Sequence, residues 1–358
     1  MATATGVFHT TYRKDLALRH TRAEHVRLGL LVAVAVWLPF GLSTYWLGWT
    51  NLILLSVIAA VGLNILLGYT GLISLATAGF LGVGAYTAAN LAVFHNWPMI
   101  PAVLAATVLA ALIGAFFGLP ALRLKGLYLA ISTFAAQEIL EERFRAWKWL
   151  TTPPGATREQ GNIVTSHPSI GSWQLNTKEE WYWVLLVITG LIVWGSINLF
   201  RTGLGRAFVA IRDQDIAAEV MGVPVGRYKV LAFSLACGMA GFSGAMQAFY
   251  LDTQVVTWEN YVLEKSFIFV AMIIVGGLGS VSGAIYGVAF MTWLPAYIQR
   301  IGSTLRESSF DFIVLELPAI QLGLFGFVLV VFLLVEPRGL ARLWQRVKDY
   351  FRLWPFRY

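Results

Sequence analysis

Long apolar windows recur along the chain, and they constrain its fold more than any other feature. They run from Leu28 to Val335, at lengths near the roughly 20 residues that a helix needs to cross a bilayer. A transmembrane β-barrel would show alternating segments of about ten residues instead. Hydrophobic residues make up 58% of the 358 and charged residues only 13%. The sequence therefore predicts an all-α, polytopic transmembrane helical bundle.

Basic residues orient this bundle, because they gather beside the apolar windows at 13–27, 123–125, 201–229 and 338–357. Such clusters are typical of cytoplasmic loops. The net charge of +7 thus reflects a membrane face, and no nucleic-acid partner is expected. Both termini are expected inside, with about ten crossings. The expected crossings are Leu28–Leu47, Asn51–Leu67, Leu72–Phe94, Ile100–Gly118, Leu127–Leu140, Trp181–Leu199, Val230–Tyr250, Phe267–Val275, Gly283–Ile298 and Ile320–Val335.

Two of these windows are rich in glycine, the stretches around 69–93 and 273–287. They favour broken or re-entrant helices, so eight full crossings plus two such elements is an alternative. The expected organisation is a cytoplasmic tail at 1–27, a transmembrane domain at 28–335 and a cytoplasmic tail at 336–358. No cleavage pattern follows the first apolar run, so we expect it to be retained. The polar stretch 141–180 is expected outside and 201–229 inside.

Helical spacing also characterises the last 23 residues. Their apolar members predict an amphipathic helix on the inner membrane surface, with contact to a specific partner as the alternative. These members are Leu340, Leu343, Trp344, Val347, Phe351 and Trp354. Small residues spaced by four, such as Ala236, Ala240 and Gly244, predict tight helix packing in lipid.

Catalytic and nucleotide-binding motifs are absent from the sequence. It has no GxxxxGK[ST] phosphate loop, no HExxH and no CxxC, and its five histidines have no metal-ligand spacing. Cys237, the only cysteine, lies in an apolar window and predicts a buried packing residue. We therefore expect neither enzymatic activity nor a cofactor bound by this chain. Charges in the middle of the windows are nearly missing, which disfavours ion-coupled transport.

The exception to the apolar pattern is the stretch from Arg201 to Lys229, which holds five basic and three acidic residues. Burying eight charges at about 2.5 kcal/mol each would cost roughly 20 kcal/mol, so the stretch must stand in water. Asp213 and Asp215 suit the first turn of a short helix that Gly222 and Pro224 would end. Its apolar face would comprise Ile216, Ala217, Val220 and Met221, with Ala217 and Ala218 letting a partner come close. The pattern alone fits either a docking element or an ordinary interfacial loop.

Five stretches in order resemble the M-type permease of branched-chain amino acid ABC importers. They are NILLGYTGLISLATAGFLGVGAYTAA, GLPALRLKGLYLAISTFA, GRAFVAIRDQDIAAEVMGVPVGRYKVLAFSLACGMAGFSGA, VGGLGSVSGAIYG and EPRGL. The resemblance implies a bacterial inner-membrane subunit that pairs with an H-type permease, two cytoplasmic ATPases that use ATP and Mg, and a periplasmic substrate-binding protein. The stretch 201–229 would then be the coupling loop. Its expected contacts with the ATPase are Arg212, Asp213, Asp215, Ile216, Ala217, Ala218, Glu219, Met221 and Gly222.

A substrate path is expected where polar residues interrupt apolar helices. The candidates are Asn64, Ser74, Thr77, Thr133, Gln137 and Glu138, whose alternative role is hydrogen bonding between helices. The chain departs from the family pattern at Gly71-Leu72, at Ala76-Thr77 and in the outer loop. Branched-chain amino acids are thus the expected substrates, with urea, short amides or aromatic acids as alternatives. A facilitator or ion-coupled carrier that needs no ATPase, and a membrane enzyme or scaffold, remain competing hypotheses.

Overall fold

The computed structural model describes residues 22–147, 163–165, 169–170, 173–250, 255–306 and 339–353, with a few helical positions between 323 and 334. The chain divides into two compact units, Met1–Gly48 and Trp49–Tyr358. In the first unit, helix α2 (Arg22–Gly41) ends before α3 begins at Thr44. The expected crossing Leu28–Leu47 is therefore wrong as a single helix. Pro39 lies in the last turn of α2, where its missing N–H removes one hydrogen bond to the preceding turn.

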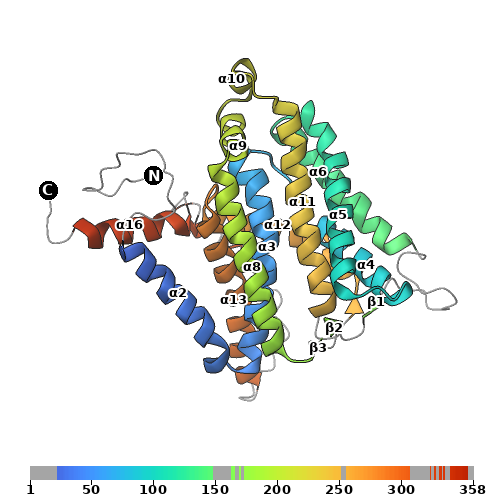
Figure 1. The fold of residues 1–358 in the computed structure, drawn as a ribbon, viewed down its shortest axis with the longest axis vertical. Helices are drawn as coiled ribbons and strands as arrows, with labels where there is room; N and C mark the ends of the chain where they lie inside the picture. Colours follow the sequence, from blue (N-terminus) through green and yellow to red (C-terminus); the bar gives the residue numbers. More distant parts are fainter. Residues whose placement is uncertain are drawn as a thin grey trace. The chain divides into compact units, whose positions relative to one another are not determined.

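The described part of the second unit is built almost entirely of helices, the first of which, α3, begins in the first unit (Figure 1). In chain order they are α3 (Thr44–Asn64), η1 (Ile65–Tyr69), α4 (Thr77–Phe94), α5 (Met99–Gly118), η2 (Leu119–Leu122), α6 (Leu127–Ala146), α8 (Lys178–Arg201), α9 (Gly203–Asp213), α10 (Asp215–Val220), α11 (Val225–Tyr250), η3 (Trp258–Tyr261), α12 (Leu263–Gly276), α13 (Val281–Arg306) and α16 (Leu340–Leu353). Two short antiparallel pairs complete the described part: β1 (Ile163–Val164) with β4 (Val255–Val256), and β2 (Ser169–Ile170) with β3 (Trp173–Gln174).

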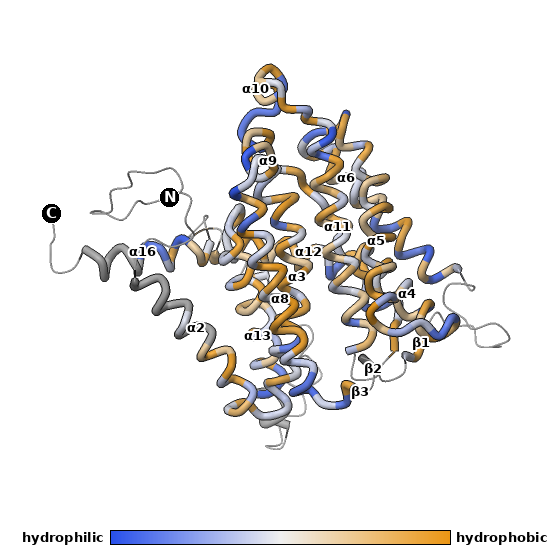
Figure 2. Tube along the Cα trace, viewed as in Figure 1, coloured by the Kyte–Doolittle hydropathy of each residue, from blue (hydrophilic) through white to orange (hydrophobic). Residues whose placement is uncertain are grey.

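Six segments within the described residues are long and apolar enough to cross a membrane. They are Thr44–Tyr69, Thr77–Phe94, Met99–Leu122, Lys178–Arg201, Val225–Tyr250 and Val281–Arg300. The predicted all-α, multi-pass class is confirmed. Figure 2 shows these helices as hydrophobic over most of their length, with hydrophilic residues gathered around α9 and α10.

Several expected crossings differ from these helices. The element expected at Phe267–Val275 is α12, whose 14 residues are about 21 Å long. This is shorter than the roughly 30 Å of bilayer hydrocarbon, so α12 alone is no full crossing. Helix α4 begins at Thr77 rather than Leu72, because the preceding residues are unwound. Helix α6 runs beyond Leu140 into charged turns, and most of 320–335 lies outside the described residues.

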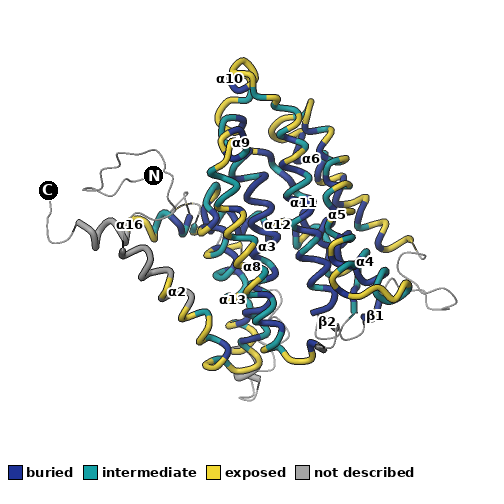
Figure 3. Tube along the Cα trace, in the orientation of Figure 1, coloured by how far each residue is buried: buried dark blue, intermediate teal, exposed yellow. Residues whose placement is uncertain are grey.

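The core of this unit forms around α11, which packs against both α4 and α5. Figure 3 shows buried residues along α11 and α4. The helices approach closely because glycines face one another: a Cβ on Gly84 would overlap the carbonyl oxygen of Gly241, and one on Gly244 would overlap that of Leu81. The tight packing predicted for the small-residue lines of this helix is confirmed.

The loops lie at the two ends of the bundle. Helices α9 and α10 stand at one end, and β1, β2, β3 and the start of α8 lie at the other (Figure 1). Thr177 caps α8 in a capping box with Glu180, which fixes where this helix begins. The predicted C-terminal helix is present as α16, with Trp344 exposed.

Candidate functional site

The charged insert folds into two short helices between α8 and α11. Helix α9 ends at Asp213, Gln214 is extended, and α10 covers Asp215–Val220. Gly222 then takes a left-handed conformation with φ of +85°, and the Val223 amide donates to the Ala218 carbonyl at 3.0 Å. This is the C-terminal cap that glycine favours, so α10 stops where the sequence predicts.

The start of this helix differs from the expectation. Asp213 was expected in its first turn together with Asp215, but it is the last residue of α9. The reason is the extended Gln214, which separates the two helices, and the pairing of Asp213 with Arg212 at 3.1 Å. Only Asp215 lies in the first turn of α10, where a carboxylate interacts favourably with the helix dipole.

An apolar surface of α10 and its C-terminal turn points away from the rest of the chain. Ile216 is 63% exposed, and Val220 and Met221 are each 83% exposed. Ala217 and Glu219 are exposed as well, whereas Ala218 is buried against the chain itself. Ala217 therefore offers more surface to a partner than Ala218 does, and the expected ATPase contacts stay a prediction. Apolar side chains exposed together are typical of interaction surfaces, and contact of α10 with an ATPase stays a prediction.

Asp215 ties α10 to the bundle. Its Oδ2 lies 2.6 Å from Lys125 Nζ, in the loop after η2, and 3.5 Å from Lys229 Nζ, near the start of α11. The hydrogen bond from Lys125 and the charges of both lysines lower the pKa of Asp215 below its usual value. Because the Lys229 side chain is only 5% exposed, its charge depends on this carboxylate for a partner.

Arg212 connects the end of α9 to η1, the last turn of the α3 segment. Its Nη1 donates to the carbonyl oxygen of Gly68 at 3.1 Å, while its Nε and Nη2 donate to Asp213. Gly68 lies in η1, a π-helical turn that continues α3. The Arg212 side chain thus reaches the membrane-embedded helices, and its expected contact with the ATPase stays a prediction.

The glycine-rich windows are both broken, as their composition favoured. After η1 the chain is unwound from Gly71 to Ala76, and α12 and α13 are separated by residues 277–280. Asn64 joins the two breaks: its Oδ1 accepts from the Gly279 amide and its Nδ2 donates to the Ser280 carbonyl, each at 3.0 Å. Local π-helix and unwound backbone are common at functional sites and need such partners inside a membrane.

Side chains from α6 and α12 accept hydrogen bonds from the backbone amides at the start of α4. Gln137 Oε1 accepts from the Gly79 amide at 2.6 Å, and Ser266 Oγ accepts from the Ala78 amide at 2.8 Å. The Leu75 amide donates to Thr133 Oγ1 at 3.0 Å. These bonds occupy amides that a broken helix would otherwise leave free.

Five of the six residues expected along the substrate path are therefore buried within the chain: Asn64, Ser74, Thr77, Thr133 and Gln137. The sixth, Glu138, is exposed on α6. A cavity beside Ser74 and Thr77 holds only about 10 Å³, barely the space of one water molecule. Asn64, Thr133 and Gln137 make the interhelical bonds named as their alternative role, and the path itself stays a prediction.

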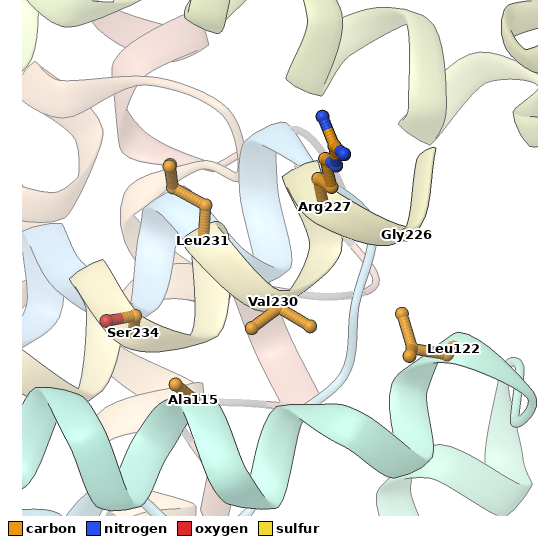
Figure 4. A pocket seen from close by; sticks show the side chains of 7 residues that line it. All are labelled: Ala115, Leu122, Gly226, Arg227, Val230, Leu231 and Ser234. Carbon is orange, nitrogen blue, oxygen red and sulfur yellow. The ribbon is translucent and has the colours of Figure 1, made fainter. Parts of the chain in front are cut away.

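A larger groove of about 620 Å³ lies elsewhere, between α5 with η2 and the start of α11. Figure 4 shows Val230 and Leu122 facing this groove, with Arg227 at one end of it. The expected path residues take no part in its lining, which is mainly apolar. The groove suits lipid or a packed helix better than a polar solute.

Sequence reasoning missed several residues of this site. Gly68 and Gly279 provide backbone for the contacts, Ser266 completes the cap of α4, and Lys125 and Lys229 hold Asp215. The glycines were visible as breaks, and the lysines as basic residues beside spans. Most of their partners were not visible because they lie far away in the chain: Gly68 is 144 residues from Arg212, Ser266 is 188 from Ala78 and Gly279 is 215 from Asn64.

Comparison with known proteins gives this geometry a context. Residues 45–333 match the family model described as the permease component of the branched-chain amino acid transport system. The chain belongs to this permease family. It is a multi-pass membrane transport subunit, and the competing carrier hypothesis is not favoured.

Individual relatives of this permease belong to import systems as well. It is 28% identical to the high-affinity branched-chain amino acid transport system permease protein LivM of Escherichia coli (strain K12), over 87% of this chain and 73% of that one. LivM of Salmonella typhimurium is 27% identical over the same shares. The autoinducer 2 import system permease protein LsrC of Salmonella paratyphi B is 24% identical over 56% of each chain. No solved structure matches.

Proposed function

We propose that this permease is one of two membrane subunits of an ATP-driven importer for branched-chain amino acids. The observation that carries the proposal is the match to the permease family over 45–333, together with the 28% identity to LivM over most of both chains. ATP and Mg act on two partner ATPases, and a substrate-binding protein delivers the amino acid. The chain itself provides membrane helices and no catalytic group.

The exposed apolar surface of α10 supports the ATPase partnership. Three large apolar side chains, Ile216, Val220 and Met221, stand in water at the end of the bundle that carries Arg201 to Lys229. An ATPase that covers them gains apolar burial, which favours association by roughly 25 cal/mol per Å². The proposed orientation places this end and both termini in the cytoplasm, in agreement with the basic clusters.

Reconstitution in proteoliposomes tests the function. The permease, a second permease of the same system, the two ATPases and the binding protein are reconstituted, and uptake of radiolabelled leucine is measured with and without ATP. We expect uptake only with ATP and the complete set. Uptake by the permease alone, or without nucleotide, would establish a facilitator and overturn the proposal.

The same vesicles test the substrate. Unlabelled isoleucine and valine should compete with leucine, whereas urea, acetamide and phenylacetate should not. Competition by one of the latter three, with no effect of valine, would keep an ATP-driven importer but assign it to a different substrate class.

A further inference from the structure

Arg212 joins the end of α9 to η1, two parts of the permease that are remote in sequence. It stands at the end of α9, and its guanidinium spans from Asp213 to the carbonyl of Gly68. Its side chain is 40% exposed, so it lies at the boundary between the hydrophilic loop and the packed helices. A guanidinium suits this place because its fixed fork of donors serves two acceptors at once.

The Gly68 carbonyl is an acceptor that the helix itself cannot use fully. The π-helical turn ends at Tyr69, and the Leu72 amide donates back to Leu66 at 3.0 Å. A helix end leaves carbonyls that need another donor, and inside a membrane no water replaces it cheaply. Arg212 Nη1 provides this donor and carries a positive charge to the negative end of the helix dipole.

The second helix break lies directly against the first. A Cβ on Gly68 would overlap the Gly279 amide, and a Cβ on Gly279 would lie 3.1 Å from the Gly68 carbonyl oxygen and 3.2 Å from Arg212 Nη1. The Asn64 amide bridges the same two segments. On its other side the loop 277–279 meets Gly339, whose Cβ would overlap Gly277. These backbones have no free space between them, so they move together or lose their contacts.

We propose that Arg212 is a positioning residue that fastens the α9–α10 segment to the paired helix breaks at 65–76 and 276–280. The functional part of this inference rests on the proposed ATP-driven function. When the ATPases displace α10, the movement reaches both breaks through the Arg212 guanidinium as well as along the continuous helix α11. Asp215 provides a separate attachment, to the loop after η2 and to α11.

A charge-neutral variant tests this role in the reconstituted importer. In Arg212→Gln we expect bound ATPases and ATP hydrolysis close to wild type, with leucine uptake per ATP reduced at least tenfold. Arg212→Lys should restore part of the ratio, because an ammonium can still donate to Gly68. The matched control is Arg206→Gln, which removes the same charge from an exposed position of α9 and should leave the ratio unchanged.

Two results would overturn the proposal. Loss of bound ATPases in Arg212→Gln, but not in Arg206→Gln, would make Arg212 a direct ATPase contact. An unchanged ratio of uptake to hydrolysis in Arg212→Gln would show that the breaks need no such attachment.

Hydrogen–deuterium exchange separates the attachment from the transport function. In the full-length permease in detergent, Arg212→Gln should raise amide exchange in 64–72 and 276–284 by at least about tenfold, the effect of losing one hydrogen bond from a charged donor. Arg206→Gln should not. Equal exchange in both variants contradicts the attachment, whereas raised exchange in a permease that shows no ATP-dependent uptake supports it and rejects the proposed function alone.

Discussion

At the scale of single residues, glycine decides how closely this permease can pack. In lipid no hydrophobic effect drives helices together, so van der Waals contact between backbones carries much of the association. Gly84 and Gly241 place α4 and α11 in such contact, and Gly244 does so one turn further along. A Cβ on Gly84 or Gly244 would meet a carbonyl oxygen, which cannot rotate away as a flexible side chain could.

Gly84→Ala should therefore destabilise the permease by about 1–3 kcal/mol, the usual cost of overpacking. The measurement is the midpoint of thermal unfolding in detergent, followed by size-exclusion chromatography of the heated protein, and it should fall by several degrees. Gly190→Ala on α8 is the control, because a Cβ there has open space around it. A Gly84→Ala midpoint equal to that of Gly190→Ala would contradict the close contact of α4 and α11.

At the scale of elements, α10 combines an attached side with an exposed side. Ala218 is buried and Asp215 binds two lysines, so the helix is held against the bundle. Ile216, Val220 and Met221 remain outside. This division is what a docking element requires, since it must both receive a partner and transmit its movement.

Met221→Asp should weaken ATPase binding at least tenfold, because it places a charge in an interface that we expect to be apolar. Co-purification of the ATPases with the tagged permease measures the loss. Thermal stability of the free chain should stay unchanged, because the side chain is 83% exposed. Met221→Leu, which conserves volume, should bind as the wild type does. Full ATPase recovery with Met221→Asp would remove this surface from the interface.

Breaks in the helices define the other elements of interest. The sequence predicted crossings at Leu72–Phe94 and Phe267–Val275, and named the glycine-rich windows as alternatives to simple spans. The structure shows that α4 begins late and α12 is short. Their position could not be read from composition, since it depends on Asn64, Gln137 and Ser266 reaching across from other elements to bond the freed backbone.

At the scale of the whole molecule, the two ends of the bundle should face opposite sides of the membrane. The α10 loop carries basic neighbours and lies at one end, while the start of α8 lies at the other (Figure 1). We expect the end with the basic residues to face the cytoplasm.

Cysteine labelling tests this orientation. A membrane-impermeant maleimide should label Glu179→Cys in intact spheroplasts, and should label Glu219→Cys only after the membrane is opened, because both side chains are exposed at opposite ends. The unmodified chain is the control: Cys237 is buried and should give little background. Labelling of Glu219→Cys from outside would invert the orientation and exclude an ATPase at α10.

The sequence by itself determined the class of this protein, its membrane location and the place of its charged insert at 201–229. These follow from the cost of burying charge and from the length of helix that crosses a bilayer. Both depend only on which residues a short stretch of the chain contains. Only the tertiary structure decided which residues meet. It turned Arg212 inward to Gly68, buried Ala218 and used Gln137 and Asn64 to bond broken backbone. Such contacts join residues far apart in the chain, and their energies exist only once the helices have packed.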